Sequence, residues 1–372
     1  MTLAPLFDPA DFRIPAGVVH VCAGGEPPFL YRHDAALLQY AQDKSTGMPG
    51  RTAMEARVEA ARAGAARMWR VSPDTIGFVS SVADGVSMVA ESIDWRAGDN
   101  VCIDSNEYPS VAAPFALQRR PPVALRVASG SGADRLAAYV DARTRVIGVS
   151  AVSYLTGERF DLAALRRLAD SVGALLVVDY TQAAGWMQID AAVTDFAFSA
   201  CYKWLLGMTG VAVAYWNRQR QPGWTPTTAG WHSIDYARRP EYTAPLHVQA
   251  DALRFTRGNP AHGPVYVLTG ALDYLARFEP AAVERHVMQL SGDLLDRLRD
   301  LQIPAMTPAD PARHGANVCI ESPRAAAIHD ALYARGIYAW NGYGRVRFSF
   351  HGYNGAADID RIVAALREVW RG

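Results

Sequence analysis

The segment Asp195–Tyr215 reads DFAFSACYKWLLGMTGVAVAY and carries the most information about the architecture. The apolar runs at its two ends, DFAFSA and VAVAY, are typical of buried strands. Lys203 stands just after the first run, between two aromatic residues, although lysine is almost never buried without a partner or a function. A lysine in an apolar pocket has a lowered pKa and becomes nucleophilic. Taken alone, the pattern also fits a lysine that extends from a strand end to water.

The same alternation continues on both sides of this segment. Helical patterns at Arg51–Trp69 and Leu162–Val172 separate short apolar runs. Such alternation predicts a mostly parallel sheet with helices on both faces. Ligands in such sheets bind beyond the carboxyl ends of the strands. The strands that we expect are Thr75–Ser80, Val101–Asp104, Val146–Val152, Leu175–Asp179, Asp195–Ala200 and Val211–Trp216.

A carboxylate ends the strand that precedes this lysine segment. Asp179 lies in LLVVDYTQAAGW, where a buried carboxylate is costly unless it is paired. Together with a nucleophilic lysine, it predicts a site for pyridoxal 5′-phosphate (PLP). Asp179 would pair with the protonated pyridine nitrogen and keep the ring an electron sink. Gln182, three residues later, is placed to hydrogen-bond the phenolic oxygen of the ring. An ordinary helix cap is the alternative for Asp179 on its own.

Three further segments fit the same site. In FVSSVADGVSMVAES a strand runs into a helix, and free N–H groups at a helix start bind anions. Ser81, Val82 and Ala83 are therefore placed to hold the phosphate, although such residues also cap ordinary helices. Tyr108, in DSNEYPSV, is placed to stack on the ring or simply to pack. The strand Arg345–Phe350 presents arginines, one of which can bind a substrate carboxylate through two hydrogen bonds.

In this order, the pieces resemble the class V aminotransferase family of fold-type I PLP enzymes. That family includes cysteine desulfurases, selenocysteine lyases, kynureninases, isopenicillin N epimerase-like proteins and aminotransferases. The resemblance covers nearly the whole chain and rests on the strand–DxxQ–strand–K order around Asp179 and Lys203. It implies an α/β fold with a mostly parallel, seven-stranded sheet sandwiched by helices, and a smaller α+β C-terminal domain.

The resemblance also implies roles for individual residues. Lys203 matches the lysine that forms the Schiff base with PLP, and Arg347 matches the arginine that binds the α-carboxylate. Ser153 falls on the substrate side. The family pattern implies a homodimer with active sites at the interface, to which relatives contribute the residue that Asn259 matches. The expected cofactor contacts are Ser81, Val82, Ala83, Tyr108, Asp179, Gln182, Tyr202, Lys203, Trp231 and Asn259.

The branch of the family stays open. Cysteine desulfurases carry a persulfide-forming cysteine before the arginine strand, but Gly336–Arg345 (GIYAWNGYGR) contains none. The motifs NEYPS, SYLTGERFD and GWH lean towards kynureninase, whereas Gln182 and Ser153 replace the histidine and asparagine frequent there. We therefore expect aminotransferase or side-chain lyase chemistry on an α-amino acid. A kynureninase-like hydrolase and an amino-acid epimerase are the alternatives.

Composition bounds the remaining possibilities. The 372 residues suggest about two domains, and a formal net charge of zero argues against nucleic acid or an anionic membrane as main partner. The four cysteines form no CxxC pair, so neither a disulfide framework nor a metal site is expected. No signal peptide and no apolar stretch of about 20 residues is visible, which favours a cytoplasmic enzyme.

The expected domains follow from changes in pattern along the chain. We expect an N-terminal segment 1–30 that packs on the small domain, a large PLP-binding domain 31–255 and a small domain 256–372. The Pro-, Gly- and Trp-rich stretch Gln219–Pro264 predicts a functional loop region. A non-catalytic PLP-fold scaffold is disfavoured because Lys203 and Asp179 are both present. A nucleotide-binding oxidoreductase lacks its glycine-rich turn between strand and helix.

Overall fold

A seven-stranded sheet forms the centre of the computed structural model, which describes residues 3–119, 121–130, 132–235 and 240–370. β8 runs antiparallel to both of its neighbours, and all other neighbouring pairs are parallel. From one edge to the other the strands are β2 (Ile76–Val79), β8 (Ala212–Trp216), β7 (Phe196–Ala200), β6 (Leu175–Asp179), β5 (Thr144–Ser150), β3 (Asn100–Asp104) and β4 (Ala124–Ala128).

The predicted α/β fold with a mostly parallel sheet is confirmed, and all six expected strands belong to this sheet. The edge strand β4 was missed. Its sequence, ALRVA, places an arginine at the centre and leaves most positions partly or fully exposed. The apolar run that marks the buried strands is therefore absent from it.

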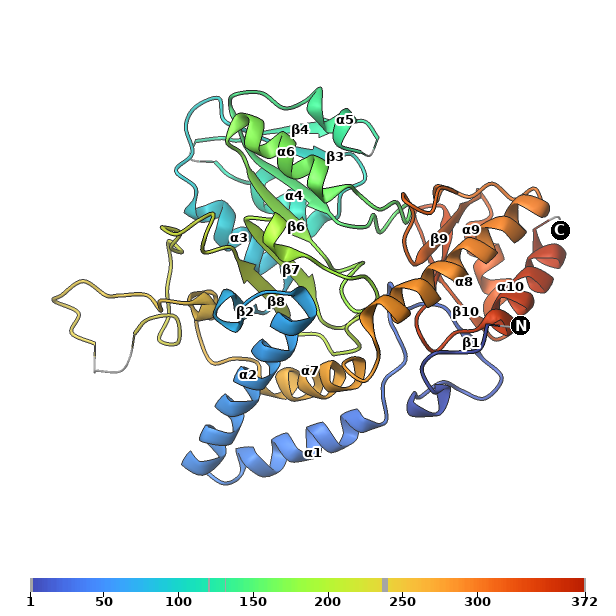
Figure 1. The fold of residues 1–372 in the computed structure, drawn as a ribbon, viewed down its shortest axis with the longest axis horizontal. Helices are drawn as coiled ribbons and strands as arrows, with labels where there is room; N and C mark the ends of the chain where they lie inside the picture. The colour runs from blue at the N-terminus through green and yellow to red at the C-terminus, as the bar shows by residue number, and fades with distance from the viewer. Residues whose placement is uncertain (1–2, 120, 131, 236–239, 371–372) are drawn as a thin grey trace.

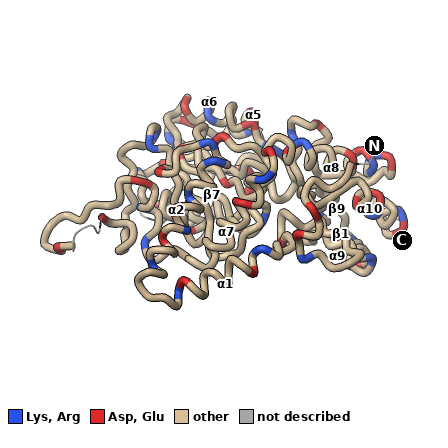
Figure 2. The backbone as a smooth tube through the Cα atoms, turned by 60° about the horizontal axis from the view of Figure 1, so that its bottom comes forward, with Lys and Arg blue, Asp and Glu red and all other residues tan. Residues whose placement is uncertain are grey.

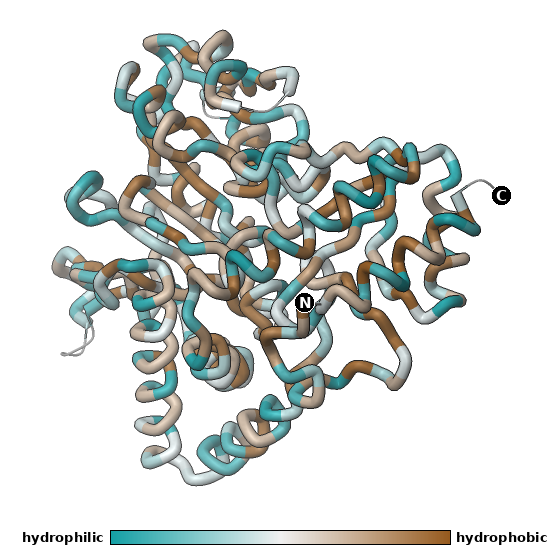
Figure 3. Tube along the Cα trace, turned by 45° about the vertical axis from the view of Figure 1, so that its right-hand side comes forward, coloured by the Kyte–Doolittle hydropathy of each residue, from teal (hydrophilic) through white to brown (hydrophobic). Residues whose placement is uncertain are grey.

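Helices cover both faces of the sheet (Figure 1). Alternate strand residues face opposite sides, so Val101 and Ile103 pack in one core and Cys102 in the other. Hydrophobic residues gather along the strands at the centre of the molecule (Figure 3). One face carries α3 (Val82–Ser92) and α4 (Pro109–Ala116), and the other carries α2 (Met48–Trp69), α5 (Ala133–Ala137) and α6 (Leu162–Val172).

A smaller α+β part lies beside the large sheet (Figure 1). Its antiparallel sheet has the order β11 (Trp340–Gly342), β12 (Arg345–Ser349) and β9 (Asn317–Glu321). The N-terminal segment joins it, because β1 (Val19–His20) pairs in parallel with β10 (Ile337–Tyr338). The remaining helices are α1 (Arg32–Lys44) and α7 (His262–Leu275), which pack with α2, and α8 (Pro280–Asp300), α9 (Ala325–Tyr333) and α10 (Ala356–Val369).

The chain after β8 extends away from the body of the molecule (Figure 1). In its described part, the regular structure up to α7 is the 3-10 turn Ala252–Phe255, as expected for a loop region. Further 3-10 turns are Pro9–Asp11, Pro73–Thr75 and Ala191–Val193. Acidic and basic residues are interspersed along the backbone (Figure 2). Within the described residues, no helix is both long enough and apolar enough to cross a membrane.

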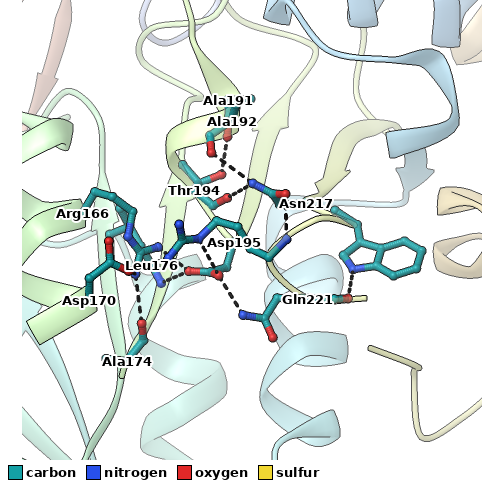
Figure 4. A network of polar contacts seen from close by, with 12 residues as sticks. Arg166, Asp170, Ala174, Leu176, Ala191, Ala192, Thr194, Asp195, Asn217 and Gln221 are labelled. Carbon is teal, nitrogen blue, oxygen red and sulfur yellow. Dashed lines mark hydrogen bonds and ion pairs between the residues drawn. The ribbon is translucent and has the colours of Figure 1, made fainter. Parts of the chain in front are cut away.

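A buried ionic network fastens the sheet at the end opposite to the carboxyl ends of its parallel strands (Figure 4). Asp195, 1% exposed, precedes β7. It accepts hydrogen bonds from the Leu176 N–H (2.8 Å), Arg166 Nη1 (2.5 Å) and Gln221 Nε2 (2.8 Å). Asn217, just after β8, donates to the carbonyls of Ala192 and Thr194. The network therefore joins β6, β7, β8 and α6.

Asp195→Ala is expected to lower the free energy of unfolding by about 3–5 kcal/mol, because it leaves the guanidinium of Arg166 buried without this carboxylate. The unfolding temperature would fall by roughly 5 °C. Asp170→Ala is the matched control, since that carboxylate also pairs with Arg166 but is half exposed; its cost should stay within about 1 kcal/mol. Equal losses in the two variants, measured by urea unfolding, would contradict this account.

Candidate active site

A cavity of about 200 Å³ opens at the carboxyl ends of β6 and β7. This is the position expected for a ligand in an open parallel sheet. The cavity brings together five of the predicted site residues around Lys203: Ser81, Val82, Tyr108, Asp179 and Tyr202. It is completed by Ser80, Ser110, Thr181, Ala200, Thr209, Gly210 and Val211.

Lys203 lies in the turn after β7 and is only 7% exposed. Its Nζ is 5.4 Å from the ring centre of Tyr108 and 5.5 Å from that of Tyr202. Burial, the largest cause, and the positive charge of Arg347 together lower the pKa of Lys203 to about 8, although the negative charge of Asp179 opposes them. At pH 7 about a tenth of this lysine is therefore the free amine, which can act as a nucleophile or a base.

Asp179 is the last residue of β6 and is 4% exposed. Its Oδ1 accepts a hydrogen bond from the Thr181 N–H (2.8 Å), and Thr181 Oγ1 accepts one from the Ala200 N–H (2.9 Å). These bonds tie the end of β6 to the end of β7, and so fix Asp179 relative to Lys203. Burial raises the pKa of Asp179, whereas the hydrogen bonds from Thr181 and the charge of Lys203 lower it.

The start of α3 provides backbone donors at the same cavity. Ser81 caps this helix, and its Oγ accepts the N–H of Asp84 (3.1 Å). The first N–H groups of a helix have no partner within the helix, and together with the helix dipole they favour an anion. Ser81 and Val82 line the cavity of Lys203, whereas Ala83 lines a neighbouring hollow beside α4. A phosphate held here would lie beside the lysine.

The aromatic wall of the cavity connects it to the arginine strand. The ring of Tyr108 packs edge-on against Tyr154, with ring centres 4.9 Å apart. Arg347, 2% exposed, donates from Nη1 to the carbonyl oxygen of Tyr154 (2.9 Å). Its guanidinium lies 4.8 Å from the ring centre of Trp340. Burial lowers the pKa of Arg347.

The structure places Gln182 away from the cavity lining. Its Nε2 donates to the Gly24 carbonyl (2.9 Å), and its Oε1 accepts from Trp204 Nε1 (3.0 Å) and Asn317 Nδ2 (3.1 Å). The amide thus links the large sheet to the N-terminal segment and to β9. Its expected contact with the ring oxygen stays a prediction.

Ser153 is used in a turn. Its Oγ accepts the N–H groups of Leu155 and Thr156 (both 3.2 Å), and its side chain is not among those that line the cavity. Its position next to Tyr154 nevertheless puts it in the loop that carries the carbonyl bound by Arg347. The substrate-side role of Ser153 stays a prediction.

Asn259 and Trp231 lie beyond the cavity of Lys203. Asn259 lines an adjoining cavity of about 170 Å³ that shares Ser80 and Gly210 with it. The Oδ1 of Asn259 accepts a hydrogen bond from Arg51 Nη1 (2.7 Å). The same guanidinium lies 5.3 Å from the ring centre of Trp231, whose side chain is 45% exposed. The expected contacts of these two residues with the cofactor stay predictions.

Glu107 is a site residue that the sequence reading missed. Its carboxylate accepts hydrogen bonds from the Ser150 N–H (2.7 Å), Ser150 Oγ (2.5 Å) and the Tyr108 N–H (2.7 Å). It therefore holds the turn that carries Tyr108 against the end of β5. Removal from water raises the pKa of Glu107 to about 7, although the Ser150 and Tyr108 donors lower it. The sequence does contain a signal for this residue, because the acidic side chain in NEYPS directly follows the end of a predicted strand.

Glu107→Gln is expected to remove a pH dependence of stability between pH 4.5 and 7. Because the folded state raises this pKa, it binds more protons than the unfolded state in this range, and stability falls as pH rises through it. The group contributes at most about 3 kcal/mol to that fall. Urea unfolding of both proteins at pH 4.5 and 7.5 measures the difference. The exposed Glu91 provides the control, and an identical pH slope in wild type and Glu107→Gln would refute the assignment.

Comparison with known proteins identifies the family of the chain. The sequence model described as Aminotransferase class-V matches residues 34–362. The chain belongs to the class V aminotransferase family. It is therefore a PLP-dependent enzyme of the transferase and lyase type, and its fold is fold-type I.

Relatives and solved structures cover most of the chain. A probable cysteine desulfurase of Methanothermobacter thermautotrophicus is 26% identical over 345 residues, 84% of each chain. A kynureninase of Pseudomonas fluorescens is 27% identical over 213 residues, 55% of this chain and 50% of the relative. The apo structure of a cysteine desulfurase from Thermococcus onnurineus superposes with a TM-score of 0.87 over 100% of both chains at 20% identity. The structure of a C-DES mutant with glycine covalently linked to its PLP cofactor gives 0.89 at 22% identity, over 98% of this chain and 100% of that one.

Proposed function

We propose that the protein acts on the α-carbon of an α-amino acid, with PLP bound covalently to Lys203. The observation that carries the proposal is the buried lysine with a pKa of about 8, which shares a cavity with a buried carboxylate and a helix start. When bound, PLP supplies an electron sink for the electrons left on the α-carbon as a bond there breaks.

The described residues have separable roles in this proposal. Asp179 would hold the ring nitrogen protonated, and the N–H groups at the start of α3 would hold the phosphate. Tyr108 presents its ring face towards Lys203. Arg347 would bind the α-carboxylate and so orient the bonds at the α-carbon. The free amine of Lys203 would then take up and return the proton at that carbon.

The surroundings of the cysteines help to distinguish among the reactions that the family catalyses. Burial raises the pKa of each of the four thiols, Cys22, Cys102, Cys201 and Cys319. A persulfide-forming cysteine needs an accessible thiolate. We therefore propose transamination or side-chain cleavage that does not pass sulfur to a protein thiol. Analysis of the products distinguishes the two reactions. Transamination yields a keto acid that retains the side chain, whereas side-chain cleavage yields alanine.

Reductive trapping tests the proposal sharply because the chain contains only two lysines, Lys44 and Lys203. The yellow protein, purified with PLP, is treated with sodium borohydride, digested and analysed by mass spectrometry. The expected result is one pyridoxyl-phosphate group on the peptide of Lys203 and none on that of Lys44, which is exposed at the end of α1. Label on Lys44 alone, or on neither lysine, overturns the proposal.

We further propose that the enzyme is a homodimer with its active sites at the interface. The support is the exposed aromatic and polar surface around Trp231 and Asn259, which borders the cavity of Lys203. Sedimentation equilibrium measures the mass in solution. If Asn259 acts across the interface, Asn259→Ala should weaken PLP binding in the variant homodimer, whereas mixed dimers with Lys203→Ala subunits should regain one site of wild-type affinity.

A further inference from the structure

Two arginines lie side by side on one face of β12. Arg345 and Arg347 are two residues apart, so their side chains leave the same face of the strand. Both are buried, with exposed fractions of 1% and 2%. A single arginine is enough to bind the α-carboxylate of an amino acid, so the second is in excess of what the proposed function requires.

In the part of the chain that the structure describes, no carboxylate forms an ion pair with either arginine. Both guanidinium groups instead converge on one neutral acceptor, the carbonyl oxygen of Tyr154, at 3.4 Å from Arg345 Nη2 and 2.9 Å from Arg347 Nη1. The buried Nε and Nη1 atoms of Arg345 find no hydrogen-bond partner among the residues that the structure describes. Two like charges are thus held together out of water, which is costly until an anion joins them.

Aromatic rings surround the guanidinium of Arg345 but do not neutralise it. It lies 4.9 Å from the ring centre of Trp340, 5.4 Å from that of Tyr154 and 5.6 Å from that of Tyr343. Ring faces attract a cation more weakly than a carboxylate does. Such a cage stabilises the cation. It leaves the N–H groups of Arg345 available to a ligand that lies in the plane of the guanidinium.

The pair borders the proposed active site. Tyr154, whose carbonyl both arginines bind, packs its ring against Tyr108. Tyr108 in turn lines the cavity that holds Lys203. The positive charge of Arg347 also lowers the pKa of Lys203, and its influence on that pKa is second only to burial. An amino acid bound through its α-carboxylate by Arg347 would therefore lie close to Arg345, which shares the Tyr154 carbonyl with Arg347.

We propose that the substrate is an amino acid with an anionic side chain, whose second negative group is bound by Arg345 while Arg347 binds the α-carboxylate. The proposal rests on the proposed function, since it assigns the substrate class of that same site. Arg345 would then be a specificity-determining residue. The competing role is structural: the arginine would only fasten the loop of Tyr154 to β12.

Binding of a matched pair of probes to the PLP-loaded protein tests the proposal by calorimetry. Glutarate and glutaramate have the same length and differ by one negative charge. The wild type is expected to bind glutarate at least tenfold more tightly. Arg345→Gln should abolish this preference while it retains the affinity for glutaramate, whereas Arg347→Gln should weaken both. Arg299→Gln is the control, because Arg299 is an exposed arginine of the same part of the molecule.

Every outcome of this calorimetric experiment either supports or overturns the proposed substrate class. Equal affinity of the wild type for the two probes overturns the proposal without any variant, and so does a preference for glutarate that survives in Arg345→Gln. A purely structural arginine predicts that Arg345→Gln lowers the unfolding temperature and the affinity for both probes alike, which also overturns it. Failure of the proposed function has a different signature, namely that borohydride leaves Lys203 unlabelled.

Discussion

Lys203→Ala is expected to lower the rate of proton removal from the α-carbon of the substrate by at least about 10⁴-fold. The variant loses both the amine that carries PLP and the base at the reacting carbon, and no other lysine lies in the cavity. Exchange of the α-proton with deuterated solvent, followed by NMR, measures this step directly. Added methylamine should restore part of the rate, because it supplies the missing base.

Thermal unfolding distinguishes this loss of activity from misfolding of the variant. The folded state lowers the pKa of Lys203 to about 8, so below pH 8 the folded protein bears the full cost of a buried ammonium. That cost decreases as pH rises from 8 towards the ordinary lysine value. The PLP-free variant should therefore unfold at no lower temperature than the PLP-free wild type at pH 7. Lys44→Ala is the control, and exchange at the wild-type rate in Lys203→Ala would show that another group is the base.

Asp179→Asn is expected to lower kcat by roughly 10²–10³-fold with little change in KM. The amide fits the space of the carboxylate, but it lacks the negative charge that would keep the ring nitrogen protonated. The substitution should also change the pKa of Lys203. In the wild type the negative charge of Asp179 raises this pKa, so its loss should lower the pKa of Lys203 below about 8. The pH at which Lys203 reacts with PLP, followed by absorbance, should therefore shift downwards.

Asp134→Asn, an exposed substitution, is the control for Asp179→Asn. Three results together support the role of Asp179: a lower kcat, a preserved KM and a downward shift of the lysine titration. An upward shift, or a loss confined to KM, would instead place Asp179 among the residues that only shape the substrate pocket.

The sequence allowed the central sheet and the core of the site to be predicted because both leave local signals. Buried strands appear as apolar runs, and charged residues at their ends, such as Asp179 and Lys203, stand out because burial of a charge needs a reason. Strand β4 left no such signal, since its exposed edge position tolerates Arg126. Topology then explains why Asp179 and Lys203 meet, as parallel neighbouring strands end at the same edge of the sheet.

Contacts between distant parts of the chain escaped prediction. The amide of Gln182 bonds the carbonyl of Gly24, 158 positions away, and this partner is invisible in any local pattern. Glu107 acquires its raised pKa from its surroundings at the end of β5 and not from its neighbours in sequence. The absence of an ion pair at Arg345 among the described residues is likewise a property of the folded surroundings.

The two lysines occupy opposite environments, and this has a practical consequence. Lys203 is enclosed beside the sheet, whereas Lys44 is exposed where α1 ends. Among the lysine side chains, activated esters will therefore modify Lys44 and spare Lys203. A dye or a biotin group on Lys44 marks the end of α1 and leaves the amine in the cavity unmodified.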